Sequence, residues 1–178
     1  MRRTTCALLA LVAMAAATAL AQQTTQVHPG KGGSPHVRSE WTVHGASISI
    51  EYGRPYLKGR AEAELMPAGK PWRTGADEAT TLKTDKALKF GDVTVPAGTY
   101  TLYTVPEAGQ WTLAISKRTG QWGIPVQVND DLGRVKMAVA KTAAPVEQLT
   151  ISIDGAASGG TLRIEWGTVS STVPFTVG

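Results

Sequence analysis

The sequence predicts an all-β fold: a single antiparallel β-sandwich, or a barrel-like variant of it, with long charged loops and at most one short helix. Three observations lead to this prediction. Apolar and polar residues alternate in many short segments, a pattern that places one strand face on a core and the other in water. Turn-forming residues separate these segments at short intervals, as in antiparallel sheets. No helical pattern exceeds about two turns, so crossover helices for a parallel sheet are missing.

The alternating segments are the expected strands. They are residues 47–52, 111–116, 135–139, 149–153 and 162–166. Turn residues at 96–98 and 107–109 bound a further strand over 99–105, which predicts successive hairpins. The best helical candidate is the short segment 61–66. Trp111 and Trp166 fall on the apolar phase of their strands and are expected in the core.

The N-terminus has the pattern of a cleavable export signal. Arg2 and Arg3 precede an uncharged run, and Ala19-Leu20-Ala21 supplies the small residues that signal peptidase reads. The run is too short and too rich in Ala for a membrane anchor, which needs about 20 strongly apolar residues. We therefore expect residues 1–21 to be removed and the protein to reach the periplasm or the extracellular space.

The remaining chain divides into two parts. Residues 22–34 are polar, contain Gly and Pro and show no periodicity, which predicts a flexible tail. Residues 35–178 form the single predicted domain, without a membrane span. A domain of this length buries roughly two-thirds of its surface, which is enough for it to fold without disulfides.

Cysteine content and charge exclude several functions. Cys6 is the only cysteine and lies in the predicted signal, so the mature chain has no disulfide, thiol nucleophile or thiolate metal site. Removing Arg2 and Arg3 from the 18 basic residues leaves 16 against 14 acidic ones, a net charge of +2. No run or stripe of basic residues remains, so nucleic acid is not an expected partner.

Two neighbouring segments, residues 52–60 and 71–80, concentrate reactive groups. The second combines an indole, a guanidinium, two adjacent carboxylates, hydroxyls and a Gly within ten residues. Loops carry binding and catalytic residues more often than regular elements do. These segments are therefore the expected location of a site, or of a buried polar clamp.

Both segments resemble the bacterial family known as domain of unknown function 2911. The resemblance is carried by Glu51-Tyr52-Gly53-Arg54-Pro55, Lys58-Gly59-Arg60, Met66-Pro67, the segment from Pro71 to Thr80, Pro96-Ala97-Gly98-Thr99-Tyr100-Thr101-Leu102-Tyr103, Trp111, Gln121-Trp122-Gly123 and Glu147. It extends from about Ser34 to the C-terminus. It implies an exported bacterial β-rich domain and no particular reaction. The resemblance implies Asn in many members of the family at the position where this chain has Asp77, which adds a negative charge beside Glu78.

The arginines of these segments allow two interpretations. A guanidinium is a rigid fork of donors suited to carboxylate or phosphate. In the first interpretation Arg73 or Arg54 bonds Glu78 and the carbonyls of the long loops in an internal network that fixes this region. In the second, at least one arginine stays free to hold a small polar or anionic ligand or an envelope component. The candidate binding residues are Arg54, Lys58, Arg60, Trp72, Arg73, Asp77, Glu78 and Trp122.

Other kinds of site have less support in the sequence. His28, His36 and His44 lack the spacing of a local metal site, so neither a metal ion nor another cofactor is expected. No Gly-x-Ser-x-Gly elbow is present. The expected function is an exported, non-catalytic binding or interaction domain. The alternative is an enzyme for a small polar or saccharide substrate, with Arg73, Asp77 and Glu78 as its catalytic cluster.

Overall fold

The structure is a computed structural model that describes residues 22–178; the predicted signal, residues 1–21, lies outside this part. The elements are β1 (Gln23–His28), η1 (Lys31–Gly33), β2 (His36–Val43), β3 (Ala46–Gly53), α1 (Glu62–Leu65), β4 (Thr81–Thr84), β5 (Leu88–Phe90), β6 (Val93–Val95), β7 (Gly98–Val105), β8 (Gln110–Ser116), β9 (Asp131–Ala156) and β10 (Gly159–Val177). Strands make up 61% of the structure and helices 4%, which confirms the all-β prediction. No helix within the described range is long and apolar enough to cross a membrane.

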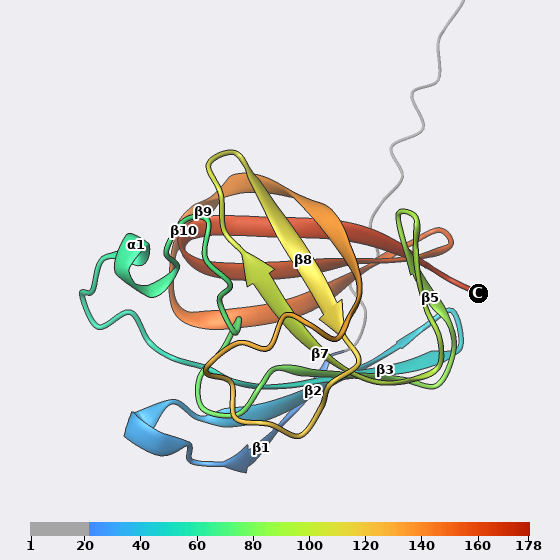
Figure 1. Ribbon diagram of the computed structural model, residues 1–178, viewed down its shortest axis with the longest axis horizontal. Helices are drawn as coiled ribbons and strands as arrows, with labels where there is room; N and C mark the ends of the chain where they lie inside the picture. The colour runs from blue at the N-terminus through green and yellow to red at the C-terminus, as the bar shows by residue number, and fades with distance from the viewer. Residues whose placement is uncertain (1–21) are drawn as a thin grey trace, which may run out of the picture.

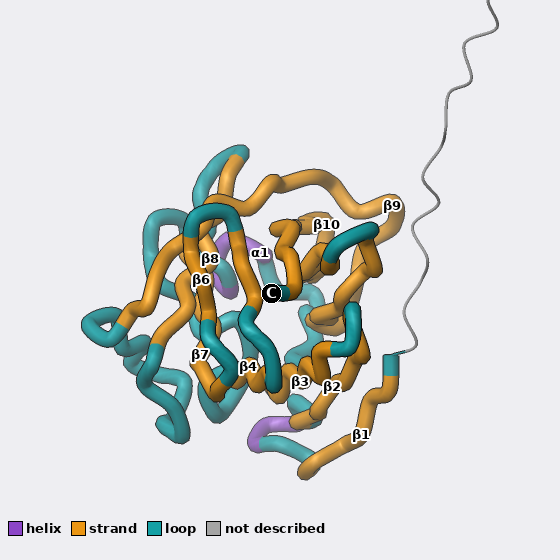
Figure 2. Tube along the Cα trace, turned by 90° about the vertical axis from the view of Figure 1, so that its right-hand side faces the viewer, coloured by secondary structure: helices purple, strands orange, loops and turns teal. Residues whose placement is uncertain are grey.

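All described strands belong to one antiparallel sheet. Their order is β1-β2-β3-β4-β7-β8-β9-β10-β5-β6, and the sheet does not close into a barrel. It curves so that its halves face each other, and β2 contacts both β9 and β10 across the interior (Figures 1 and 2). This arrangement confirms the predicted antiparallel all-β fold, with one open, curved sheet in place of two separate sheets or a closed barrel.

The core fills the space between the two halves of the sheet. It includes Trp41 from β2, Leu113 from β8 and Ile164 from β10, each on the apolar phase of its strand. Trp111 and Trp166 are buried in the same cluster, as their phase predicted. Because burial of apolar surface is the main favourable contribution to folding, this continuous core holds the domain together without a disulfide.

Residues 22–34 are not the flexible tail that their composition predicted. β1 pairs antiparallel with β2, from Gln23 opposite Glu40 to His28 opposite His36. β1 is an edge strand whose side chains are mostly exposed, so it has no apolar face and no alternation that the sequence could reveal. Its backbone hydrogen bonds to β2 order it and bring His28 to the charged loops.

β9 and β10 are longer than the alternation indicated, since β9 joins the expected strands 135–139 and 149–153 into one. The pairing of β9 with β10 shifts register between the pairs Lys141–Val169 and Val146–Gly167. The residues between them include Pro145, which lacks the N–H that a regular ladder requires and is tolerated at such irregularities. The strand therefore continues through an irregular stretch rather than ending at a turn.

Candidate functional site

The two charged segments of the sequence lie against each other at one end of the sheet. The amide of Ala76 donates to the carbonyl of Gly53 at 3.2 Å. A side chain at Gly53 would overlap the Ala76 carbonyl, so the close approach requires glycine. The 71–80 loop is also held by the segment after β8, because the amide of Gly123 donates to the Asp77 carbonyl at 2.9 Å.

A cleft of about 530 Å³ opens between these loops. Five of the predicted binding residues line it, namely Lys58, Arg60, Trp72, Arg73 and Asp77. Arg54, Glu78 and Trp122 are not among its lining residues. The structure therefore brings together most, but not all, of the candidate residues.

Buried indoles form the inner wall of the cleft. Trp72 and Trp166 both line it, with their rings stacked at a centroid separation of 5.8 Å. Trp72 also meets Trp111 edge to face at 6.0 Å, so it belongs to the core and to the cleft wall. The backbone of Trp72 is fixed by hydrogen bonds in both directions with Thr104 of β7. This end of the cleft is apolar and firmly held.

Arg73 lies half-buried beside this wall. Its Nε donates to the Gly75 carbonyl at 3.0 Å and its Nη1 to the Asp77 carbonyl at 3.4 Å. Burial lowers the pKa of Arg73, and the negative charge of Asp77 opposes that effect. The guanidinium thus braces its own loop through two carbonyls, and it forms no ion pair with a carboxylate within residues 22–178.

Lys58 and Arg60 are exposed cations on the same cleft. The backbone of Lys58 is left-handed, with φ of 52°, and its amide donates to Glu147 Oε1 at 2.8 Å. Arg60 Nε donates to the Leu57 carbonyl at 2.9 Å. Neither side chain has a carboxylate partner in the part of the chain that the structure describes. Within residues 22–178 both cations thus remain without a balancing carboxylate at the cleft, although Arg60 also donates through Nη2 to the Tyr56 carbonyl.

Arg54 has a scaffolding position. Its Nε donates to the Leu149 carbonyl and its Nη2 to Thr150 Oγ1, both at 2.9 Å. These bonds fasten the end of β3 to β9. The sequence suggested an internal network of Arg54 or Arg73 with Glu78, but neither arginine forms an ion pair with Glu78 in the described structure. The predicted pairing with Glu78 is therefore wrong, because the Glu78 carboxylate lies beside two histidines. The predicted bonds to loop carbonyls are present for Arg73.

Asp77 and Glu78 are adjacent in sequence, but their side chains contact different parts of the structure. Asp77 has left-handed backbone, with φ of 62°, and its Oδ2 accepts from the Lys31 amide at 2.7 Å. Glu78 instead directs its carboxylate to two histidines, and its backbone forms an isolated bridge with Trp122. Because Glu78 does not line the cleft, Arg73, Asp77 and Glu78 do not converge there as a catalytic cluster.

Trp122 lies outside the cleft. It is exposed, and the Nζ of Lys31 lies 4.8 Å from the centroid of its ring, a distance typical of a cation–π contact. The indole therefore holds the side chain of Lys31, which lines the cleft. Its contribution to the site is indirect.

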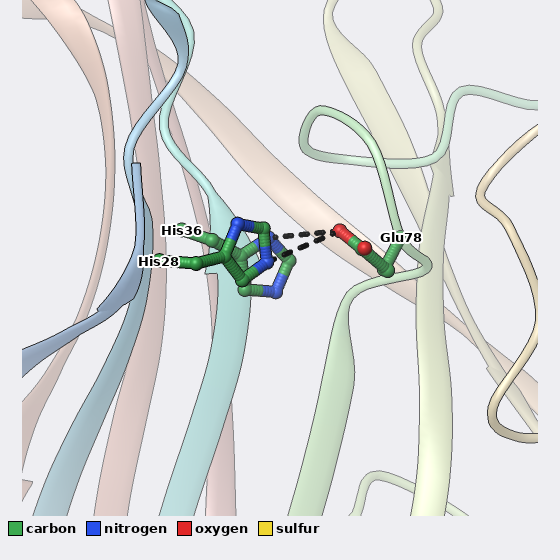
Figure 3. A group of neighbouring side chains, drawn as sticks. All are labelled: His28, His36 and Glu78. Atoms are coloured by element: carbon green, nitrogen blue, oxygen red, sulfur yellow. Dashed lines mark ion pairs between the residues drawn. The ribbon is translucent and has the colours of Figure 1, made fainter. Parts of the chain in front are cut away.

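His28, His36 and Glu78 form a cluster that the sequence analysis missed (Figure 3). Glu78 Oε2 lies 3.6 Å from His28 Nε2 and 3.3 Å from His36 Nδ1. The two imidazole rings stack at 4.6 Å, because His28 and His36 are direct cross-strand partners. The Gly-rich turn between them, residues 29–33, was the available indication that they face each other across a hairpin.

Comparison with known proteins identifies the family. The profile described as "Protein of unknown function (DUF2911)" matches residues 34–175. The chain belongs to this family. The resemblance carried by the Pro71–Thr80 segment and its companion motifs is thereby confirmed, and the DUF2911 match includes every residue of the cleft except Lys31, Gly32 and Gly33. No curated protein and no solved structure matches the chain.

Proposed function

We propose that this DUF2911 protein is an exported, non-catalytic domain that binds a small anionic ligand in the cleft between the charged loops. The observation that carries the proposal is the unbalanced charge of the cleft. Its lining holds four cationic side chains, Lys31, Lys58, Arg60 and Arg73, against two carboxylates, Glu64 and Asp77. A carboxylate or phosphate group would complement this excess.

The donors of the cleft support an anion more than a neutral ligand. Lys58 and Arg60 have no carboxylate partner in residues 22–178. Arg73 uses Nε and Nη1 for its own loop, which leaves the N–H groups of Nη2 for a ligand because a guanidinium has five donors. Charge-assisted hydrogen bonds from such groups are roughly twice as strong as neutral ones.

The volume of the cleft and its apolar wall indicate the size of the ligand and the nature of its uncharged part. A cleft of about 530 Å³ falls in the range of roughly 300–1,000 Å³ that holds small molecules. The buried indoles of Trp72 and Trp166 offer a flat apolar surface for the carbon skeleton or ring of the ligand. A ring or short chain that carries one or two acidic groups fits both features.

The export part of the proposal rests on the N-terminal sequence. Arg2, Arg3, the apolar run and Ala19-Leu20-Ala21 have the arrangement of a signal peptide. A ligand of the periplasm or the medium is then the relevant class, such as an acidic sugar, an organic acid or a phosphate ester.

Calorimetric titration of the purified protein with inorganic phosphate, citrate and glucuronate tests the proposal, with glucose as the neutral probe. We expect at least one anion to bind and to raise the melting temperature, while glucose has no effect. Lys58→Ala and Arg60→Ala should each weaken binding of that anion by at least about tenfold, since a charge-assisted hydrogen bond contributes about 1.5–3 kcal/mol.

Lys89→Ala is the matched control. Lys89 is an exposed lysine of β5 outside the cleft, so its removal changes the net charge equally without touching the site. Equal weakening by all three variants would indicate a general charge effect and contradict a specific cleft. Failure of all three anions to bind better than glucose would also overturn the proposal.

A further inference from the structure

We infer that His28, His36 and Glu78 form a binding site for a divalent transition-metal ion of the zinc type, separate from the anion cleft. Zinc is bound in proteins by imidazole nitrogens and carboxylate oxygens. The three ligand atoms, one from each side chain, lie within 4.8 Å of one another (Figure 3). The proposal does not depend on the proposed ligand of the cleft.

The fold brings these residues together from three separate segments. His28 ends β1, His36 begins β2, and their pairing in the hairpin places the imidazoles side by side. Glu78 comes from the charged loop, whose backbone is fixed next to it by the bridge between Glu78 and Trp122. Rigid strands therefore position the two nitrogens, and an anchored loop brings the carboxylate.

The distances between the ligand atoms suit a tetrahedral ion. Ligand atoms about 2.0–2.2 Å from zinc, at tetrahedral angles, are about 3.3–3.6 Å apart. Glu78 Oε2 is 3.3 Å from His36 Nδ1 and 3.6 Å from His28 Nε2. Two edges of the expected tetrahedron are thus already present.

The inner part of the cluster has polar atoms without hydrogen-bond partners. His36 is only 2% exposed, and its Nδ1 and the Oε2 of Glu78 are both buried without a hydrogen bond in the described structure. The two atoms are close, but their contact lacks hydrogen-bond geometry. Buried polar atoms normally find a partner, and a cation between them would satisfy both.

The surrounding charge also favours a cation. Glu51 Oε1 lies 3.7 Å from His36 Nε2 on the far side of the ring, beyond hydrogen-bond distance but close enough for its negative charge to act on the imidazole. Asp77 adds a further negative charge close enough to act on His36. Arg38 forms an ion pair with Glu51, in which Nη2 lies 2.6 Å from Oε2. The positive charge of Arg38 is therefore directed to Glu51 and not to Glu78.

Metal binding requires one rearrangement, the rotation of the more exposed imidazole ring, which is that of His28. The imidazoles are 11° from parallel, so both lone pairs meet at one ion only if a ring rotates. His28 has a side chain 38% exposed, and its Nδ1 accepts from the Gly30 amide at 3.1 Å. Binding through Nε2 moves the proton of neutral His28 to Nδ1, so this hydrogen bond is released as the ring turns.

The outer side of the site is open. Glu78 has a side chain 46% exposed, so three protein ligands leave the fourth position of a tetrahedral ion to water. A zinc site with three protein ligands keeps an open position, unlike a closed structural site with four. The site can therefore exchange its ion and accept a small ligand on it.

Titration of the purified protein with Co²⁺ and with Zn²⁺, without a histidine tag and after treatment with chelator, tests the inference. Co²⁺ should give the intense visible absorption of a tetrahedral complex, and Zn²⁺ should displace it one for one. His28→Gln, His36→Gln and Glu78→Gln should each weaken binding by at least about tenfold, since even outer-shell changes cost 10–100-fold.

His44→Gln is the matched control. His44 is the third histidine, and its Nε2 lies 2.8 Å from the Ala156 carbonyl, away from the cluster. Its variant should bind Co²⁺ as the unaltered protein does. His28→Gln and Glu78→Gln replace partly exposed side chains, so they keep the test informative if loss of the buried His36 unfolds the protein. Absence of a tetrahedral spectrum, or equal binding by Glu78→Gln and the unaltered protein, would overturn the inference.

Discussion

The Oδ2 of Asp77 accepts a hydrogen bond from the backbone amide of Lys31 at 2.7 Å. This contact joins the turn after β1 to the charged loop and so connects the edge strand with the cleft. The backbone of Asp77 is left-handed, with φ of 62°, a conformation that Asp and Asn adopt more readily than other non-glycine residues. One residue thus meets a conformational and a hydrogen-bonding requirement together.

Asp77→Ala should lower the free energy of unfolding by about 2 kcal/mol or more, because it loses the bond to Lys31 and strains a left-handed position. Asp77→Asn keeps an acceptor oxygen and the tolerance for this backbone, and it should lose much less. Urea denaturation of both variants measures the difference. Equal losses in the two variants would contradict this account, because Asn retains both the acceptor oxygen and the tolerance for left-handed backbone.

Arg54→Ala should destabilise the protein, whereas Arg60→Ala should not. The Arg54 guanidinium fastens β3 to β9 through Leu149 and Thr150, and a hydrogen bond from a charged group contributes about 1.5–3 kcal/mol. Arg60 also donates to two backbone carbonyls, but these bonds are exposed and water can replace them, so its loss should stay within about 0.5 kcal/mol. Chemical denaturation distinguishes the two, and a larger effect at Arg60 would contradict this division between scaffold and site.

Stability of the metal-free protein should fall as the pH drops below the ordinary pKa of histidine. Burial lowers the pKa of His36 from 6.5, with a smaller effect of the same sign from His28, while the charges of Glu78, Glu51 and Asp77 oppose it. The unfolded chain then binds more protons than the folded chain below pH 6.5, so the His36 contribution is full above that pH and is lost progressively below it.

Denaturation in the presence of chelator at neutral and at mildly acidic pH checks the direction in which the free energy of unfolding changes with pH. His36→Asn removes the titrating group, so its stability should depend less on pH than that of the unaltered protein. His44→Asn removes an exposed histidine and serves as the control. A steeper pH dependence in the His36 variant would contradict the assignment.

Export should yield a mature chain that begins at Gln22. The prediction follows from the small residues Ala19-Leu20-Ala21 and the run before them. Intact-mass measurement of protein recovered from the periplasm or the medium checks it. Soluble cytosolic protein that retains Met1 would contradict export.

Local sequence pattern was sufficient to predict most of the fold. Alternation and turn residues predicted the antiparallel sheet, the short helix near 61–66 and the core positions of Trp111 and Trp166, because strand faces and turns depend on neighbouring residues. The composition of the charged loops also located the cleft residues Lys58, Arg60 and Arg73. These residues could be selected because binding and catalytic side chains lie disproportionately on loops.

Long-range pairing decided the rest. β1 owes its order to its partner β2, and β9 passes through Pro145 because β10 supports it on both sides. The cluster of His28, His36 and Glu78 depends on a hairpin register and on a loop more than 40 residues away in sequence. For the same reason the Glu78 carboxylate lies beside histidines and not beside Arg54 or Arg73. Sheet register and loop anchoring determine which charged side chains become neighbours, and neither produces a local sequence pattern.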